Sequence, residues 1–166
     1  MSSPRNAGFT LIELMIVVVV IAILAAVGYP SYTRWIAEAR RTDATIALQR
    51  IAATQERFMT ECGEYTDDFG GVISDPIPAN RCTGLGLGGL ADGTTTYTTD
   101  DGHYSIEATL FPGGIGGLAD NQRFQLEATP VGSQATADGS RCATFTLTSE
   151  GVKNATGSDS TKCWKK

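Results

Sequence analysis

The chain has little of the chemistry that enzymes and metal sites use. It contains one histidine, His103, in 166 residues, and its four cysteines form no C-x2-C pair. No serine or cysteine therefore has a recognisable base near it in sequence, and zinc would lack its usual ligand spacing. Asp100-Asp101 is more typical of a solvated turn than of a calcium site. We expect a protein that is not an enzyme and that needs no metal or other cofactor.

The chain also lacks an excess of positive charge. Its formal net charge is −5, which argues against binding nucleic acid over the whole surface. Residues 63–120 hold nine acidic residues and one arginine, whereas residues 121–166 hold six basic and four acidic residues. A local basic strip with one stacking aromatic is a candidate DNA contact, made of Arg123, Arg141, Lys153, Lys162, Trp164, Lys165 and Lys166. We favour the alternative, a solvated surface with a soluble tail.

Charge is almost absent from the first apolar run. The 21 residues at positions 9–29 contain one charged side chain, Glu13. A helix of this length covers about 30 Å, the thickness of a bilayer's hydrocarbon core. Inserting a carboxylate there costs about 3 kcal/mol or more. We therefore expect a membrane-spanning helix in which Glu13 needs a partner.

Two simpler interpretations of this run fit less well. A signal peptide has a shorter apolar core, although the small residues at positions 25–28 would suit a cleavage site. A plain anchor would keep its basic residues on the cytoplasmic side. Here only Arg5 precedes the run, whereas Arg34, Arg40 and Arg41 follow it on the side that carries the cysteines.

All four cysteines, Cys62, Cys82, Cys142 and Cys163, follow the apolar run. An even number without metal-binding spacing indicates two disulfides formed in an oxidising compartment. Three pairings are open. We expect the sequential pairing, Cys62–Cys82 and Cys142–Cys163, because it staples the two most irregular regions. Each bridge would close a loop of about 20 residues and contribute about 3 kcal/mol.

Glycine is scarce in the first third of the chain and frequent from Gly63 onward. Before that point, residues 31–62 have helical periodicity, and Gly63 is a suitable C-cap. Gly28-Tyr29-Pro30 predicts a kink or a locally unwound stretch before this part, with a simple bend as the alternative. We expect an amphipathic helix lying on a sheet, with a buried face made of Ala44, Ala47, Leu48, Ile51, Gln55, Phe58, Met59 and Cys62.

Three later segments alternate between apolar and polar residues. They are residues 104–110, 124–128 and 143–147, and residues 94–99 are a candidate short edge strand. Such alternation predicts an antiparallel sheet with its apolar face against the helix. The sequence therefore predicts an α+β fold. The first half of a long N-terminal helix spans a membrane, and its second half packs on a three- to four-stranded antiparallel sheet.

The motif Gly8-Phe9-Thr10-Leu11-Ile12-Glu13, followed by the apolar run, resembles the cleavage region of type IV prepilins. In that family a membrane peptidase cuts after the glycine and methylates the new N-terminus. The resemblance implies a cut between Gly8 and Phe9, and it implies that Glu13 pairs with the Phe9 amine of a neighbouring subunit. A free α-amine of pKa about 8 is cationic at neutral pH. A contact between Glu13 and Phe9 within one chain is the alternative.

The resemblance to PilE/ComP-type minor pilins extends along most of the chain. It implies the type IV pilin fold, with a leader at residues 1–8, a transmembrane and assembly helix at residues 9–35 and a periplasmic or extracellular head at residues 36–166. Glycine-rich segments at residues 70–103 and 113–119 match nothing in that family. Because such loops would carry any binding specificity, the choice of partner is the property that the resemblance predicts least well. The segments that carry the resemblance are Tyr29-Pro30-Ser31-Tyr32, Ala39-Arg40-Arg41-Thr42-Asp43-Ala44, Gln55-Glu56-Arg57-Phe58, Gly63-Glu64-Tyr65-Thr66, Ala128-Thr129-Pro130-Val131-Gly132-Ser133-Gln134-Ala135 and Cys142…Cys163-Trp164.

The function that the resemblance implies is that of a structural, minor subunit of a type IV pilus, acting in pilus biogenesis, twitching motility and adhesion. The implied partners are other pilin subunits, prepilin peptidase and the inner-membrane assembly machinery. The precursor would lie in the inner membrane of a Gram-negative bacterium, and the mature chain in the pilus at the cell surface. Two alternatives remain, a pilus-associated DNA receptor for natural transformation and a type II secretion pseudopilin.

The first prediction concerns the N-terminus of the mature chain. We expect mass analysis of the protein from cells to find a chain that begins at Phe9 and carries one added methyl group. Substitution of Gly8 should leave the uncut chain in the membrane. A mature chain that begins at Met1, or after Ala26, would contradict the prepilin interpretation.

Overall fold

The computed structural model describes residues 9–71, 82–111 and 121–164. The chain divides into two compact units, one ending at Ile36 and the other beginning at Ala37. We call them the N-terminal segment and the head. Three residues with an expected role, Gly8, Lys165 and Lys166, lie outside the described residues, as does the segment 113–119.

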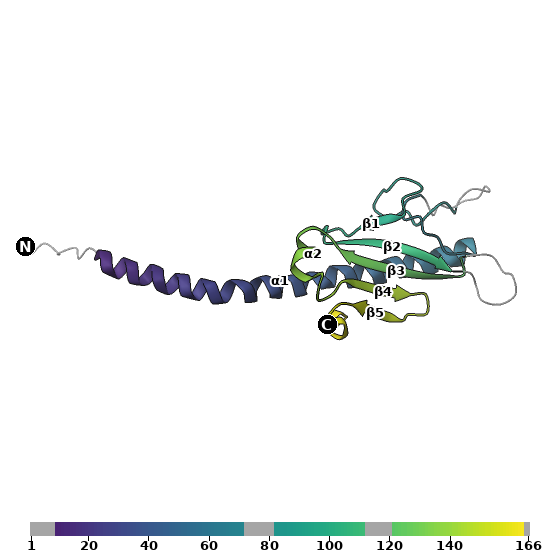
Figure 1. Cartoon of the computed structure of the whole chain (residues 1–166). Coiled ribbons are helices and arrows are strands. Elements are labelled where there is room, and N and C mark those ends of the chain that lie inside the picture. The colour runs from purple at the N-terminus through teal and green to yellow at the C-terminus, as the bar shows by residue number, and fades with distance from the viewer. Residues whose placement is uncertain (1–8, 72–81, 112–120, 165–166) are drawn as a thin grey trace, which may run out of the picture. The chain divides into compact units, whose positions relative to one another are not determined.

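One helix, α1 (Leu11–Cys62), contributes to both units (Figure 1). It passes through Gly28 and Pro30 without a break, so the prediction of a locally unwound stretch is wrong. Pro30 removes one backbone hydrogen bond, but its fixed φ is itself helical. The residues on both sides of Pro30 keep helical hydrogen bonds, so the helix continues across it.

The C-terminus of α1 has the glycine cap that the sequence predicts. Gly63 has a φ of +83°, in the left-handed region that suits glycine. Its N–H donates a 2.9 Å hydrogen bond to the carbonyl oxygen of Met59. This contact satisfies one of the free carbonyl groups of the last turn and ends the helix there.

The head contains one antiparallel sheet whose strands lie in chain order (Figure 1). Residues 104–110, 124–128 and 143–147 form its centre as predicted, and the candidate edge strand is present. The predicted three to four strands were one too few, because β5 was missed. Its residues are polar and largely exposed at the sheet edge, so they show no alternation. The strands are β1 (Thr96–Thr98), β2 (Tyr104–Phe111), β3 (Arg123–Pro130), β4 (Thr144–Thr148) and β5 (Lys153–Thr156).

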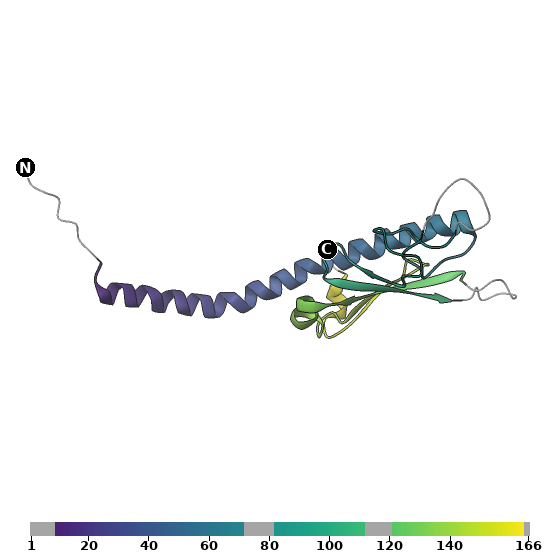
Figure 2. The same ribbon diagram turned by 90° about the horizontal axis from the view of Figure 1, so that it is seen from above.

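The strand register separates an apolar face of the sheet from a polar one. One row of paired positions runs across all five strands, and its members are Tyr97, Ile106, Ala128, Phe145 and Ala155. The head part of α1 lies along one face of the sheet (Figure 2). The buried apolar residues of α1 from Ala44 to Phe58 and this row belong to one hydrophobic core. The predicted packing of the helix on the sheet is therefore confirmed.

Two short helices complete the head. The link between β3 and β4 holds α2 (Gly132–Asp138), and α3 (Ser160–Cys163) follows β5. Neither was predicted, because each is too short to show an amphipathic period. The residues that they bury are Gln134 and Asp138 in α2 and Cys163 in α3.

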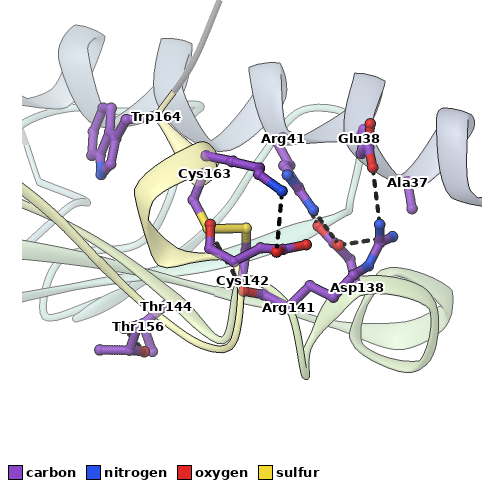
Figure 3. Close-up of a disulfide and its surroundings, with 12 residues drawn as sticks. Ala37, Glu38, Arg41, Asp138, Arg141, Cys142, Thr144, Thr156, Cys163 and Trp164 are labelled. Carbon is purple, nitrogen blue, oxygen red and sulfur yellow. Dashed lines mark hydrogen bonds and ion pairs between the residues drawn. A yellow bond between two sulfur atoms is a disulfide. The ribbon is translucent and has the colours of Figure 1, made fainter.

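Disulfides tie two segments to the core. Cys62, the last residue of α1, bonds to Cys82, and Cys142 bonds to Cys163 of α3. This is the sequential pairing. The second bond lies beside Trp164 and the edge of the sheet (Figure 3). Each bond closes a loop whose ends are 20 or 21 residues apart, which corresponds to about 3 kcal/mol of stabilisation on a loop-entropy estimate.

The glycine-rich segment after Cys82 is packed against the core. Leu85 and Leu87 are buried, and glycines alternate with them. The N–H groups of Leu85 and Leu87 donate to the carbonyl oxygens of Asp68 and Phe69. A Cβ at Gly84 would lie 2.4 Å from the carbonyl oxygen of Gly70. The glycines therefore let the backbone of residues 84–87 approach that of residues 68–70 closely, while Leu85 and Leu87 pack into the hydrophobic core.

The buried carboxylate of Asp68 holds the turns of this region. Its Oδ1 accepts a 2.8 Å hydrogen bond from the N–H of Gly70, and its Oδ2 accepts one of 2.6 Å from the N–H of Gly93. Because these contacts join segments on either side of Cys82, this part of the head has a defined hydrogen-bonded framework in addition to its disulfide.

A buried ion pair joins α1 to α2. Arg41 Nε and Nη2 donate to Asp138 at 2.6 and 2.7 Å, and the Asp138 side chain is fully buried (Figure 3). Arg141 lies 3.0 Å from the same carboxylate and 2.9 Å from Glu38. The hydrogen bond with Asp138 raises the pKa of Arg41 above its usual value. The network therefore contains two arginines and two carboxylates.

Gln134 of α2 adds a neutral contact beside this network. Its Nε2 donates to the carbonyl oxygen of Ala37 at 2.9 Å and to the Tyr104 hydroxyl at 3.1 Å. Burial raises the pKa of Tyr104 to about 12, so its hydroxyl stays protonated at neutral pH and accepts this bond. The first turn of α1 within the head is thus held by α2 through both charged and neutral groups.

The second prediction concerns this ion pair. Replacing Arg41 with Met should lower the free energy of unfolding of the head by about 3 kcal/mol, because it removes the bidentate partner of a buried carboxylate. Arg40→Met is the matched control. Arg40 makes one 3.3 Å contact with Ser133, so its loss should cost less than about 1 kcal/mol. Chemical denaturation under oxidising conditions measures both, and equal effects would contradict the role of the pair.

Candidate assembly segment and candidate nucleic-acid surface

Thr10 caps the N-terminus of α1. Its Oγ1 accepts a 3.3 Å hydrogen bond from the N–H of Glu13, and its carbonyl oxygen accepts one of 3.2 Å from the N–H of Leu14. Thr10 and Glu13 have the spacing of a capping box. A carboxylate in the first turn also interacts favourably with the helix dipole. Glu13 therefore has a local reason to sit at this position, besides any partner on another chain.

The apolar side chains of the N-terminal segment have no cover within the described chain. The large apolar side chains of residues 11–27 are 49–78% exposed on every side of the helix. By length and composition this helix could cross a membrane. A helix that is apolar all round requires lipid or other helices around it. Glu13 is exposed among these residues, and no salt bridge to it is present in the described residues.

Five of the seven residues of the candidate DNA strip lie in the described part of the chain, and two of these, Arg141 and Arg123, have acidic partners. Arg141 is only 18% exposed and is paired with Asp138 and Glu38. Arg123 lies 3.9 Å from Glu150 beside a surface pocket lined by Phe111 and Ser149. These two arginines are therefore engaged within the head.

Lys153 and Trp164 lie together at the start of β5, and Lys162 precedes Trp164 by two positions in the sequence. Lys153 Nζ lies 5.4 Å from the centre of the Trp164 ring, and the indole N–H donates a 2.6 Å hydrogen bond to the carbonyl oxygen of Asn154. The ring also packs edge to face on Phe145 at 5.9 Å. Lys153 would have to move before a base could stack on that face of the indole.

Charge around this small group does not favour nucleic acid strongly. Lys162 lies 3.6 Å from Asp159. Residues 37–166 contain 17 acidic and 11 basic residues, a balance of −6. An interaction with phosphates would therefore be local, through Lys153 and Lys162, and sensitive to salt.

The residues that sequence reasoning missed are Arg41 on the buried face of α1 and its neighbours Asp138 and Gln134 on α2, whereas Gln55 is buried as predicted. Arg41 is not among the residues that the sequence places on the buried face, yet it is 7% exposed. A signal was present, because the buried positions 37, 41, 44, 48, 51, 55 and 58 follow one another in steps of four and three. Asp138 and Gln134 carry no such signal, since α2 has only seven residues.

Two sequence models of known families match the chain. The family described as type IV minor pilin ComP, DNA uptake sequence receptor, matches residues 30–146, which is more than half of the chain. The prokaryotic N-terminal methylation motif matches residues 3–29. Lys153, Lys162 and Trp164 lie beyond the region that the first model matches.

One of the similar proteins is named as a pilin, and another is named for its dependence on prepilin peptidase. The type IV major pilin protein PilA of Myxococcus xanthus is 39% identical over 79 residues, which cover 48% of this chain and 36% of that protein. The prepilin peptidase-dependent protein D of Escherichia coli is 29% identical over 129 residues, 75% of this chain and 88% of that protein. The match thus spans about a third of the length of the Myxococcus protein.

Among solved structures, a type IV pilin from Shewanella oneidensis is similar over 78% of this chain and 99% of its own, with 22% identity and a TM-score of 0.42. Family membership rests on the sequence matches, which run from the methylation motif through the head as far as β4. This chain belongs to the type IV pilin family, within the ComP minor pilin family that its head matches.

Proposed function

We propose that this chain is a structural, minor subunit of a type IV pilus that polymerises through the N-terminal half of α1. The observation that carries the proposal is an exposed apolar helix with one acid, placed directly after a Gly8-Phe9 cleavage motif. Such a surface is stable only in lipid or against other helices. A precursor in the membrane and a helical bundle in the fibre supply these two environments in turn.

Cleavage after Gly8 changes the charge at the start of α1. In the uncut chain the Phe9 nitrogen is an amide, and after cleavage it becomes an amine that is cationic near neutral pH. Glu13 follows one helical turn later. When subunits pack, this amine can pair with Glu13 of a neighbour at low dielectric, where an unpaired charge is costly. The pair therefore favours one axial offset between adjacent helices.

Processing and polymerisation of this kind need two further partners. Prepilin peptidase would cut the leader, and the inner-membrane assembly machinery of a Gram-negative bacterium would add the subunit to the fibre. The head would then lie at the cell surface, where it acts in twitching motility and adhesion. Two disulfides and a buried ion pair suit a domain that works outside the cell.

A second candidate function is DNA binding during natural transformation. Two observations support it, the description of the matching family as a DNA uptake sequence receptor and the contact of Lys153 with the Trp164 ring. The engaged arginines and the acidic balance of the head argue for the structural role as the main one.

The third prediction tests assembly. Glu13→Gln keeps the size of the side chain but removes its charge, so pilus number should fall at least tenfold while the precursor level in the membrane stays normal. Electron microscopy and membrane immunoblots measure the two quantities. Glu64→Gln, an exposed position in the head, is the control and should leave pili unchanged. Normal piliation with Glu13→Gln would remove the proposed role of this charge.

The fourth prediction tests DNA binding by the head, residues 37–166. If the head is a receptor, the double variant Lys153→Gln, Lys162→Gln should weaken binding and lower the slope of log K against log salt by about 1 to 2. Arg57→Gln, an exposed position on α1 paired with Glu61, is the matched control. Absence of binding at low salt would end the receptor proposal for the isolated head.

A further inference from the structure

The exposed aromatic side chains mark both ends of the apolar run. Among the described residues, the aromatic side chains that are more than 60% exposed are Phe9 at one end and Tyr29, Tyr32 and Trp35 at the other. The aromatic residues of the head are half-buried or buried, or belong to the core. The exposed aromatic side chains are therefore concentrated at the two ends of the apolar run, where the surroundings of the helix must suit aromatic rings.

We propose that Tyr29, Tyr32 and Trp35 form an aromatic stripe that lies in the lipid headgroup layer while the chain is a membrane-anchored precursor. The inference rests on the proposed function and adds where the outer boundary of the membrane falls. Tyr29, Tyr32 and Trp35 are 71%, 61% and 66% exposed, so no contact within the described chain occupies them fully.

Helix geometry places the three rings on one side of α1. A step of three residues turns the helix by about 300°, so successive members are about 60° apart and the stripe covers about 120° of the surface. The same steps advance about 4.5 Å each along the axis. The stripe is therefore compact, with about 9 Å between the Cα positions of its ends.

The length of the apolar run indicates where the aromatic stripe lies relative to the bilayer. Residues 9–29 cover about 30 Å of helix, which matches the hydrocarbon core, and the headgroup layer adds about 5–8 Å on each side. Aromatic side chains on helices point back toward the N-terminus. The Trp35 ring consequently lies over the preceding turn, within reach of the headgroup layer.

The chemistry of the stripe fits this layer better than the bilayer core or water. Tyr and Trp have an apolar ring and a polar hydroxyl or N–H, and they gather at membrane interfaces. Arg34 lies between Tyr32 and Trp35 in the sequence, but at 100° per residue its side chain leaves the helix at least about 100° away from each of the three rings. A cation at this level of the helix suits the headgroup layer better than the bilayer core. Ala37, the first buried residue of the head, follows Trp35 by two positions, so the chain leaves no spacer between the interface and the head.

The fifth prediction measures the depth of Trp35 in the full uncut chain. The protein has two tryptophans, so Trp164→Phe leaves Trp35 as the only one. In phosphatidylcholine and phosphatidylglycerol vesicles, we expect a nitroxide on the lipid headgroup to quench Trp35 more strongly than bromines on the acyl chains or acrylamide in the water. If Trp164→Phe folds poorly, the difference between the natural chain and Trp35→Phe gives the same signal.

Two matched probes calibrate the depth in a chain without Trp35 and Trp164. Leu24→Trp, eleven residues before Trp35, should be quenched most by the acyl-chain bromines. Ile46→Trp, at a position 62% exposed in the head, should be quenched most by acrylamide. Trp35 should fall between them.

Each other outcome has a definite meaning. If Trp35 behaves like either probe, the proposed boundary is wrong while the membrane-anchored precursor stands. Protection of Trp35 from all three quenchers would assign the stripe to a contact between copies and overturn the inference. If the Leu24→Trp probe is not quenched by the bromines, the membrane-anchored precursor itself fails, and the proposed function with it.

Discussion

One continuous helix has to satisfy two different environments, and the rest of the structure depends on this constraint. From Leu11 onward the first half of α1 is exposed and apolar, whereas from Ala37 one side of the same helix is buried in a folded head. The backbone of α1 stays helical across Pro30. The first half must therefore find lipid or other helices, while the second half must be covered by its own chain.

The head covers its half of α1 with contacts at several levels. The apolar row across the five strands supplies the area, and the buried pair of Arg41 and Asp138 fixes how α2 meets the first turns. At the other end, the Gly63 cap and the Cys62–Cys82 bond hold the glycine-rich segment that Asp68 organises. These contacts cover the half of α1 that belongs to the head.

The candidate DNA surface shows how tertiary contacts limit a sequence pattern. Arg141 looks like a free cation in the sequence, but it completes the charge network around Asp138. Lys153 covers the indole of Trp164, which itself packs on Phe145. Among the described residues of the predicted strip, Lys153 and Lys162 are therefore the cations left for phosphates, and both lie beyond the region that the family model matches.

The sequence by itself determined the long helix, its apolar half, the Gly63 cap, the central strands and the prepilin motif, because each depends on local periodicity or on a short motif. Only the tertiary structure decided the roles of Arg41, Gln134 and Asp138, since a buried polar residue is recognised by its partner and not by its neighbours in sequence. It also decided that β5 joins the sheet, because an exposed polar edge strand has no alternation and is held by pairing with β4 and by Trp164.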